Sequence, residues 1–208
     1  MSEGEKRPHY LAQSVAKQVV ENFASHCQRI EIAGSLRRKK EMVGDIEIVA
    51  IPIVDEQKTL WGETASDKLH FNKLLHHVDF LLQQNKIGKA KDSAGRLRWG
   101  EKMRSIDLVA ASGERYKIDL FMCKEVNWGN IFLIRTGSRA FSQWMVTKIT
   151  DGGAMPTNMR QHEGRLWEFA LGSWRALEIR EEEEWFNIVD VPYIKPEHRH
   201  EGLWYDQI

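Results

Sequence analysis

Apolar residues recur at helical spacing in two segments of the chain, residues 8–26 and 67–84. In the first segment they lie four positions apart, at Leu11, Val15, Val19 and Phe23. This spacing places side chains on one face of a helix. Pro8 suits the first helical turn, where its missing N–H would have no partner anyway. The pattern therefore predicts two amphipathic helices.

Four shorter stretches have the residue pattern of strands. The sequences RIEIAG (29–34) and GDIEIVAIP (44–52) enclose a cationic turn, and Pro52 ends the second of them. RSIDLVAA (104–111) and RYKIDLFMC (115–123) are predicted to pair around a turn at residues 112–114. The order helix, strand, strand, helix, strand pair indicates an α+β fold, built on a small mixed sheet with flanking helices.

The pattern changes after about residue 127. A short apolar stretch and a turn at Thr136-Gly137-Ser138 precede a predicted helix over 139–150, which Gly152 and Gly153 end. A strand is expected at 164–171, a short helix at 180–189 and an extended tail at 192–200. We predict two domains, 1–130 and 131–208, which pack together because no low-complexity linker separates them.

Charge balance excludes a strongly basic nucleic-acid binder, since 30 Lys and Arg residues face 30 Asp and Glu residues. The charges are nevertheless segregated. Residues 37–40 are all basic, and 86–104 hold seven cations against two acids. A neutral protein with segregated charge can still present a positive face. The 86–104 stretch is a candidate for DNA phosphate contacts, and a solvated loop is the alternative.

Hydropathy and cysteine content favour a cytoplasmic protein with no membrane association. No apolar run approaches the roughly 18 residues of a membrane span, and the amino terminus lacks the apolar core of a signal peptide. The two cysteines, Cys27 and Cys123, have no paired spacing, so neither a disulfide framework nor a cysteine zinc site is expected.

Two carboxylates share one face of the strand at 44–52. Alternate residues of a strand point the same way, so Asp45 and Glu47 project together while Ile46 and Ile48 enter the core. Like charges this close repel unless a cation lies between them. Mg²⁺ takes oxygen ligands of this kind. Solvated acids on an edge strand are the alternative for this tripeptide alone.

The preceding turn favours phosphate chemistry. Gly34 and Ser35 permit close backbone approach, and their N–H groups with the serine hydroxyl suit phosphate oxygens. Of the four cations at 37–40, Arg38 is the expected ligand, whereas Lys39 and Lys40 suit a solvated loop. Gly44, directly before Asp45, likewise has no side chain to block a ligand.

These motifs resemble the polymerase-β-like nucleotidyltransferases, and in particular the family X DNA polymerases. Gly-Ser, two arginines and Gly-Asp-x-Glu form the superfamily signature. The likeness continues through Asp119 in YKIDLF, NWGNIFLIRTGSRAF (127–141) and the PYI tail (192–194), and so spans nearly the whole chain. The resemblance implies a palm domain followed by a small α/β thumb, similar to the minimal viral member that lacks the lyase and fingers domains.

The resemblance also implies roles for single residues. Asp45 and Glu47 would bind two Mg²⁺ or Mn²⁺ ions, and Asp119 would complete the catalytic triad and draw the primer 3′-hydroxyl proton. The nucleotide would be held by a larger set, comprising Gly34, Ser35, Arg38, Gly44, Thr136, Gly137 and Ser138. In the family, the Gly137–Ser138 bond is a cis peptide.

Asp107 competes with Asp119 for the third position, because SIDL mimics KIDL. A hairpin centred on Gly113 would place Asp107 opposite Asp119, where like charges destabilise pairing. The spacing from Asp119 to the Thr-Gly-Ser turn fits the family, so Asp119 is preferred.

Several positions depart from the family pattern. Glu47 stands where the family usually has Asp, and Ile134-Arg135 replaces an aromatic pair that rejects ribonucleotides in many members. Ser142 and Val146 replace polar and basic side chains that contact the nascent base pair and template.

The sequence thus predicts a monomeric, metal-dependent DNA polymerase that adds dNMP from dNTP to a DNA 3′-hydroxyl in repair, releasing pyrophosphate. A protein partner that adds DNA contacts is compatible with this form. One alternative is a nucleotidyltransferase for another acceptor, such as RNA, a protein or a small molecule. The other is a non-catalytic module that binds DNA ends.

Overall fold

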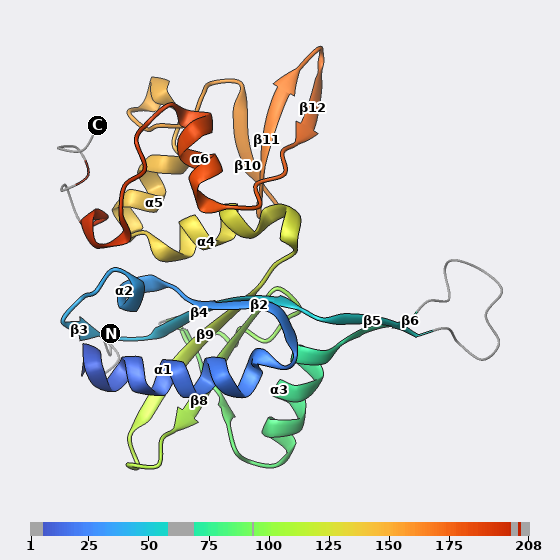
Figure 1. Cartoon of the computed structure of the whole chain (residues 1–208), viewed down its shortest axis with the longest axis vertical. Coiled ribbons are helices and arrows are strands. Elements are labelled where there is room, and N and C mark those ends of the chain that lie inside the picture. Colours follow the sequence, from blue (N-terminus) through green and yellow to red (C-terminus); the bar gives the residue numbers. More distant parts are fainter. Residues whose placement is uncertain (1–5, 58–68, 93, 201–203, 205–208) are drawn as a thin grey trace.

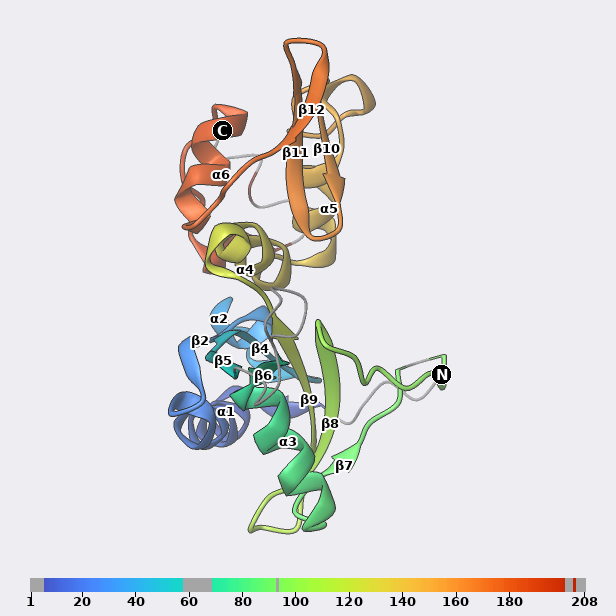
Figure 2. The same cartoon turned by 90° about the vertical axis from the view of Figure 1, so that its right-hand side faces the viewer.

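The computed structural model describes residues 6–57, 69–92, 94–200 and 204. It confirms the α+β class: a mixed sheet with helices on both faces lies below a smaller helical and sheet part (Figure 1). The turned view in Figure 2 shows the molecule as elongated, with α4 lying between the two parts. Among the described residues, no helix is both long and apolar enough to cross a membrane.

The central sheet has five strands in the order β2-β4-β9-β8-β7. β4 and β9 run parallel, and the other neighbours are antiparallel. Its strands are β2 (Cys27–Ile32), β4 (Ile46–Pro52), β7 (Gly88–Lys89), β8 (Met103–Val109) and β9 (Arg115–Met122). The parallel pair places the end of the turn at 34–44 beside the middle of β9.

Each face of this sheet is buried by a different set of helices. Even-numbered residues of β4 and β9, such as Ile48 and Leu120, form a core with the helices α1 (His9–Ala24) and α3 (Lys73–Gln83). Odd-numbered residues, such as Val49 and Phe121, pack with Trp128 of α4 (Trp128–Thr136). The strand period of two therefore separates a face against α1 and α3 from a face toward α4.

The carboxy-terminal part has its own core around Phe141, Trp185 and Leu166. Three antiparallel strands form a small sheet in the order β10-β11-β12. Its elements are α5 (Arg139–Val146), β10 (Met159–His162), β11 (Arg165–Ala170), β12 (Ser173–Ala176) and α6 (Glu182–Val189). The 3-10 turns are η2 (Glu125–Asn127), η3 (Ile149–Asp151) and η4 (Pro196–His198).

Short strands complete the described fold. β1 (Arg7–Pro8) pairs with β3 (Met42–Val43), and β5 (Val54–Gln57) pairs with β6 (Leu69–Asn72) in a ribbon that projects from the sheet (Figure 1). The four-residue helix α2 (Gly34–Arg37) follows β2.

Several predicted boundaries were wrong. The helix expected over 67–84 begins at Lys73, where Asn72 caps it, and residues 69–72 pair with β5 instead; residues 67 and 68 lie outside the described part. The helix expected over 139–150 ends at Val146, because the backbone turns extended at Thr147. The apolar stretch before Thr136 is itself a helix, α4. The domain boundary expected at residue 130 falls inside this helix and stays a prediction.

The predicted hairpin register was wrong by two residues, because the predicted centre lay one residue too far along the chain. Residues 110–114 join β8 to β9. The Ala110 N–H donates to the Glu114 carbonyl, which leaves a three-residue loop at 111–113, and Gly113 adopts a positive φ of 84°. This loop type is common in hairpins. The centre therefore lies at Ser112, so Ser105 rather than Asp107 pairs with Asp119. Asp107 lies opposite Lys117 and forms an ion pair with Arg115.

Candidate active site

The sheet brings the three predicted carboxylates together. Glu47 lies directly beside Asp119 in the parallel pairing of β4 and β9, and Asp45 immediately precedes β4. We call the surface formed by Asp45, Glu47 and Asp119 the carboxylate face. It belongs to the odd-numbered side of the sheet, toward α4.

One ammonium group bridges two of these carboxylates. Lys117 Nζ lies 2.7 Å from Asp119 Oδ2 and 3.5 Å from Asp45 Oδ2. Burial opposes the charge of this lysine, but hydrogen bonding and attraction to Asp119 and Asp45 outweigh it and raise the pKa of Lys117. The sequence signal for Lys117 was present but unused, because Lys117 and Asp119 alternate on one strand and so share a face.

Asp119 is held from both sides. Its Oδ1 accepts a 2.6 Å hydrogen bond from Ser105 Oγ, while its Oδ2 accepts the one from Lys117. Only 6% of Asp119 is exposed. Ser105 was missed because the predicted register placed Asp107 in its position.

Glu47 has a raised pKa, because the folded protein disfavours its negative charge. Burial, together with the negative charges of Asp45 and Asp119, raises the pKa of Glu47 to about 7, although Arg135 and Arg38 oppose the shift. A Cβ on Gly34 would overlap Glu47 Oε2, so the predicted glycine is needed for close approach between the turn and this carboxylate. Gly34 also has a positive φ of 61°, which favours glycine.

Arg37, the last residue of α2, and Arg38, which follows it, both contact the end of α4. Arg38 is buried and donates from Nη1 to the carbonyl oxygens of Thr136, at 2.5 Å, and Gly137, at 2.8 Å. Arg37 donates to Thr136 Oγ1 at 2.8 Å. Arg38, expected to hold phosphate, thus also ties the Gly34 turn to the Thr-Gly-Ser turn.

The remaining predicted nucleotide ligands lie near this junction or beside the carboxylates. Ser35 is partly exposed in α2, and Gly44 is exposed, with open space where a side chain would stand. Ser138 caps α5 by accepting a 3.1 Å hydrogen bond from the Phe141 N–H. The Gly137–Ser138 bond is trans, as are all peptide bonds in the described residues, so the cis bond that the family likeness implied was wrong. With the bond trans, the Gly137 carbonyl accepts from Arg38 and Ser138 serves as the cap.

A buried ion cluster behind the junction escaped the sequence analysis. Glu182 is 2% exposed. Its carboxylate accepts hydrogen bonds from both terminal nitrogens of Arg37, at 2.8 and 2.9 Å, and from Nη1 of Arg199, at 2.6 Å. Tyr193 Oη donates to the same carboxylate at 3.0 Å. Burial alone would raise the pKa of Glu182, but the hydrogen bonds from Arg199 and Arg37 reverse this and lower it. These partners lie 11 to 145 residues away in sequence, so no local pattern could have paired them.

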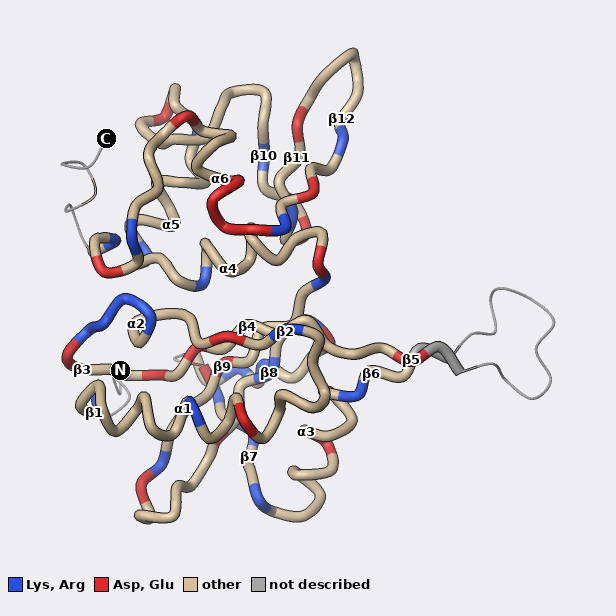
Figure 3. The backbone as a smooth tube through the Cα atoms, viewed as in Figure 1, with Lys and Arg blue, Asp and Glu red and all other residues tan. Residues whose placement is uncertain are grey.

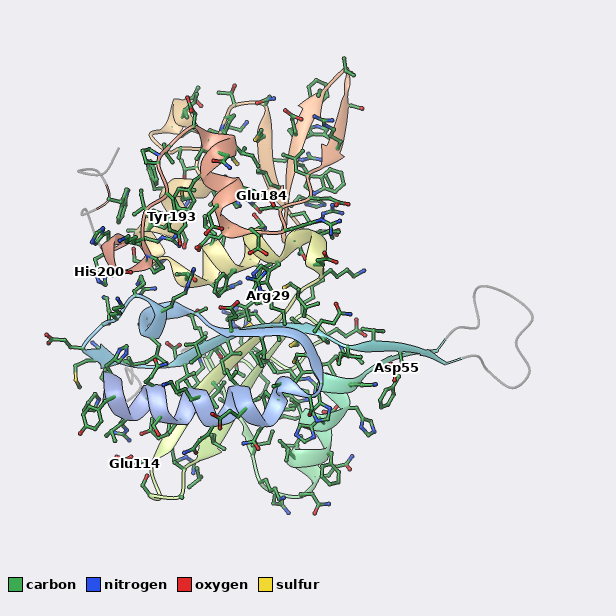
Figure 4. The ribbon with its side chains drawn as sticks, in the orientation of Figure 1. Arg29, Asp55, Glu114, Glu184, Tyr193 and His200 are labelled. Atoms are coloured by element: carbon green, nitrogen blue, oxygen red, sulfur yellow. The ribbon has the colours of Figure 1, made fainter. Side chains whose placement is uncertain are left out.

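Figure 3 shows where basic and acidic segments of the two parts face each other. In Figure 3 the basic segment around α2 faces the carboxy-terminal part, and the acidic start of α6 lies across from β2 and β4. Figure 4 shows Arg29 between the sheet and α4, and Tyr193 and His200 on the tail above α2. Arg29 Nη1 contacts Glu181 at 2.6 Å.

The 86–104 stretch is less available to DNA than its composition suggested. Arg96 and Arg98 both contact Asp92, and Arg104 is buried against Asp79 at 2.6 Å. Three of its seven cations thus form ion pairs within the chain.

The donor set fits a hard divalent cation. Three carboxylates supply oxygen ligands on one face, and Lys117 already places one positive charge between two of them. Among the described residues, no group of three or more His, Cys, Asp or Glu side chains is arranged as a closed metal site. A bound ion would compete with Lys117 for Asp45 and Asp119.

A separate cavity of about 430 Å³ opens between α1 and α3, on the other side of the sheet. None of the predicted site residues lines it, and its walls are mainly apolar. It takes no part in the chemistry of the carboxylate face.

No protein-family model matches the sequence, and no curated protein resembles it closely enough to count as a match. The functional interpretation therefore rests on the residues of the site.

Proposed function

We propose that this protein is a metal-dependent nucleotidyltransferase of the family X DNA polymerase type, which adds dNMP from dNTP to a DNA 3′-hydroxyl. The observation that carries the proposal is the pairing of Glu47 with Asp119, with Asp45 on the same face and a cation shared between Asp45 and Asp119. Carboxylates that need a counter-cation suit a reaction in which divalent ions neutralise phosphate charge.

In this proposal, Asp45, Glu47 and Asp119 would hold Mg²⁺ or Mn²⁺, which supplies charge neutralisation at the reacting phosphorus. Ser105 fixes the orientation of Asp119, which would accept the proton of the attacking hydroxyl. The N–H groups and hydroxyl at Gly34 and Ser35 are the proposed contacts for the departing pyrophosphate.

The test is incorporation of labelled dNTP into a gapped duplex with Mg²⁺ or Mn²⁺. Asp119→Asn removes the charge but keeps the shape, and we expect a loss of at least about 100-fold. Asp107→Asn is the matched control, because Asp107 lies on the neighbouring strand and pairs with Arg115. We expect the control to retain activity. Incorporation that survives Asp119→Asn contradicts the proposal.

One observation favours a second candidate, nucleotide transfer to an acceptor other than DNA. Arg96, Arg98 and Arg104 are engaged within the chain, so the predicted DNA-binding stretch offers fewer free cations. Labelled dNTPs and NTPs tested with DNA, RNA and protein acceptors distinguish the candidates. A requirement for a DNA primer supports the polymerase, and labelling of another acceptor alone supports the second candidate. DNA binding without turnover in any assay would indicate the non-catalytic module.

A further inference from the structure

The carboxylate face has a cation at each end. Along β9, residues 117, 119 and 121 alternate onto the same side of the sheet. Lys117 contacts the carboxylates at one end. At the other end, the guanidinium carbon of Arg135 lies over the Phe121 ring, 4.0 Å from the ring centre.

The strand spacing puts Arg135 within electrostatic reach of the carboxylates. Two residues of a parallel strand span roughly 7 Å, so the Phe121 backbone follows that of Asp119 by about this distance. Phe121 pairs with Val49 just as Asp119 pairs with Glu47. Burial lowers the pKa of Arg135, and the negative charges of Glu47 and Asp119 oppose that shift.

The two cations differ in their freedom to leave. The Lys117 side chain is 32% exposed on a flexible stem. Arg135 belongs to the last turn of α4, its guanidinium stacks on Phe121, and its Nε is buried without a hydrogen-bond partner. A metal ion can displace an exposed lysine, whereas the stacked arginine remains in place.

We propose that Arg135 is a permanent counter-cation of the carboxylate face. It balances Glu47 and Asp119 when no metal is bound and weakens the affinity of this face for divalent ions. The inference rests on the proposed function only for the nature of the ligand, a divalent cation.

Mn²⁺ binding at pH 8.5 and low salt, measured from the paramagnetic resonance signal of free Mn²⁺, tests the proposal. Arg135→Met removes the charge and leaves a shorter, unbranched side chain whose thioether can still contact the Phe121 ring. We expect it to tighten Mn²⁺ binding about tenfold, since a positive charge at this distance repels the ion. Arg135→Lys restores the charge and should bind Mn²⁺ within about twofold of the wild type. Arg139→Met, the same change at an exposed position of α5, should also stay within about twofold because solvent and salt screen that charge.

A metal-free measurement separates a charge effect from a packing effect. In EDTA, Arg135→Met should lower Tm by several degrees, and most of this loss should vanish when Glu47→Gln is also present. Unchanged or weaker Mn²⁺ binding in Arg135→Met overturns the proposal, as does an equal Tm loss in both backgrounds or a wild type that binds no Mn²⁺. Tightened Mn²⁺ binding in a protein that incorporates no nucleotide would support this inference and contradict the polymerase.

Discussion

The negative charge of Glu47 is disfavoured in the folded, metal-free protein. Its folded-state pKa of about 7 exceeds the ordinary value of 4.5. The folded state therefore binds this proton more tightly than the unfolded state does. The contribution of Glu47 to the free energy of unfolding therefore falls as pH rises from about 4.5 to about 7.

We expect Glu47→Gln to raise the free energy of unfolding at pH 8 in EDTA by up to about 3 kcal/mol. The gain should disappear near pH 4, where the carboxyl is protonated in both states. Urea unfolding across this pH range measures it. Glu21→Gln, at an exposed position of α1, is the control. A gain that does not vary with pH would show that charge burial is not its cause.

Glu182 illustrates the opposite case, a buried carboxylate that its partners satisfy. Removing its charge leaves Arg37 and Arg199 without their anion, and Arg199 is fully buried. We expect Glu182→Gln to lower the free energy of unfolding by about 3 kcal/mol. Glu183→Gln, at the neighbouring exposed position, should change it by less than about 0.5 kcal/mol. Equal effects of the two substitutions in chemical unfolding would contradict this assignment.

At the scale of elements, one backbone contact holds α4 against the segment before α6. The Gly129 N–H donates to the Ile179 carbonyl at 2.9 Å, and a Cβ on Gly129 would overlap the Glu181 carbonyl. The obstacle is backbone rather than a flexible side chain, so it cannot move aside locally.

Gly129→Ala should therefore destabilise the protein by about 1–3 kcal/mol, although alanine is the better helix former. Gly100→Ala is the matched control, because the nearest atom to its Cβ would lie 3.9 Å away. Thermal unfolding of the two variants compares them. A neutral or stabilised Gly129→Ala would show that α4 can shift away from α6.

At the scale of the whole molecule, α4 joins two cores. Leu133 packs into the carboxy-terminal core, whereas Phe132 and Trp128 pack against the central sheet. Arg37 also contacts α4: its guanidinium carbon lies 4.0 Å from the centre of the Phe132 ring. The two parts should therefore unfold together.

We expect tryptophan fluorescence and far-ultraviolet circular dichroism to give coincident transitions in the wild type. Fluorescence weights the carboxy-terminal part, because six of the eight tryptophans follow residue 127. Phe132→Ala should lower both midpoints, by about 3–5 kcal/mol in free energy, and separate them. Phe169→Ala, at a position 44% exposed on β11, should do neither. Separate transitions already present in the wild type would contradict the coupling.

Local sequence determined most of the helices and strands of the central sheet and the chemical character of the site, although several boundaries and the helical state of α4 were not predicted. Alternation placed Asp45 and Glu47 on one strand face, and the same rule applied to YKIDLF yields both Asp119 and Lys117. These inferences succeed because strand and helix periods are properties of adjacent residues. The predicted hairpin register was off by two residues because loop geometry, not strand composition, sets the pairing.

Only the tertiary structure decided which groups share a charge environment. It paired Glu47 with Asp119 across parallel strands, set Arg135 over Phe121, and joined Arg37, Glu182 and Arg199 in one buried cluster. Each of these contacts joins residues distant in sequence, and its strength depends on burial and on the distance between charges. Neither quantity is encoded in a local pattern, so the sequence could name the carboxylates of the face but not Arg135, which balances them from another element.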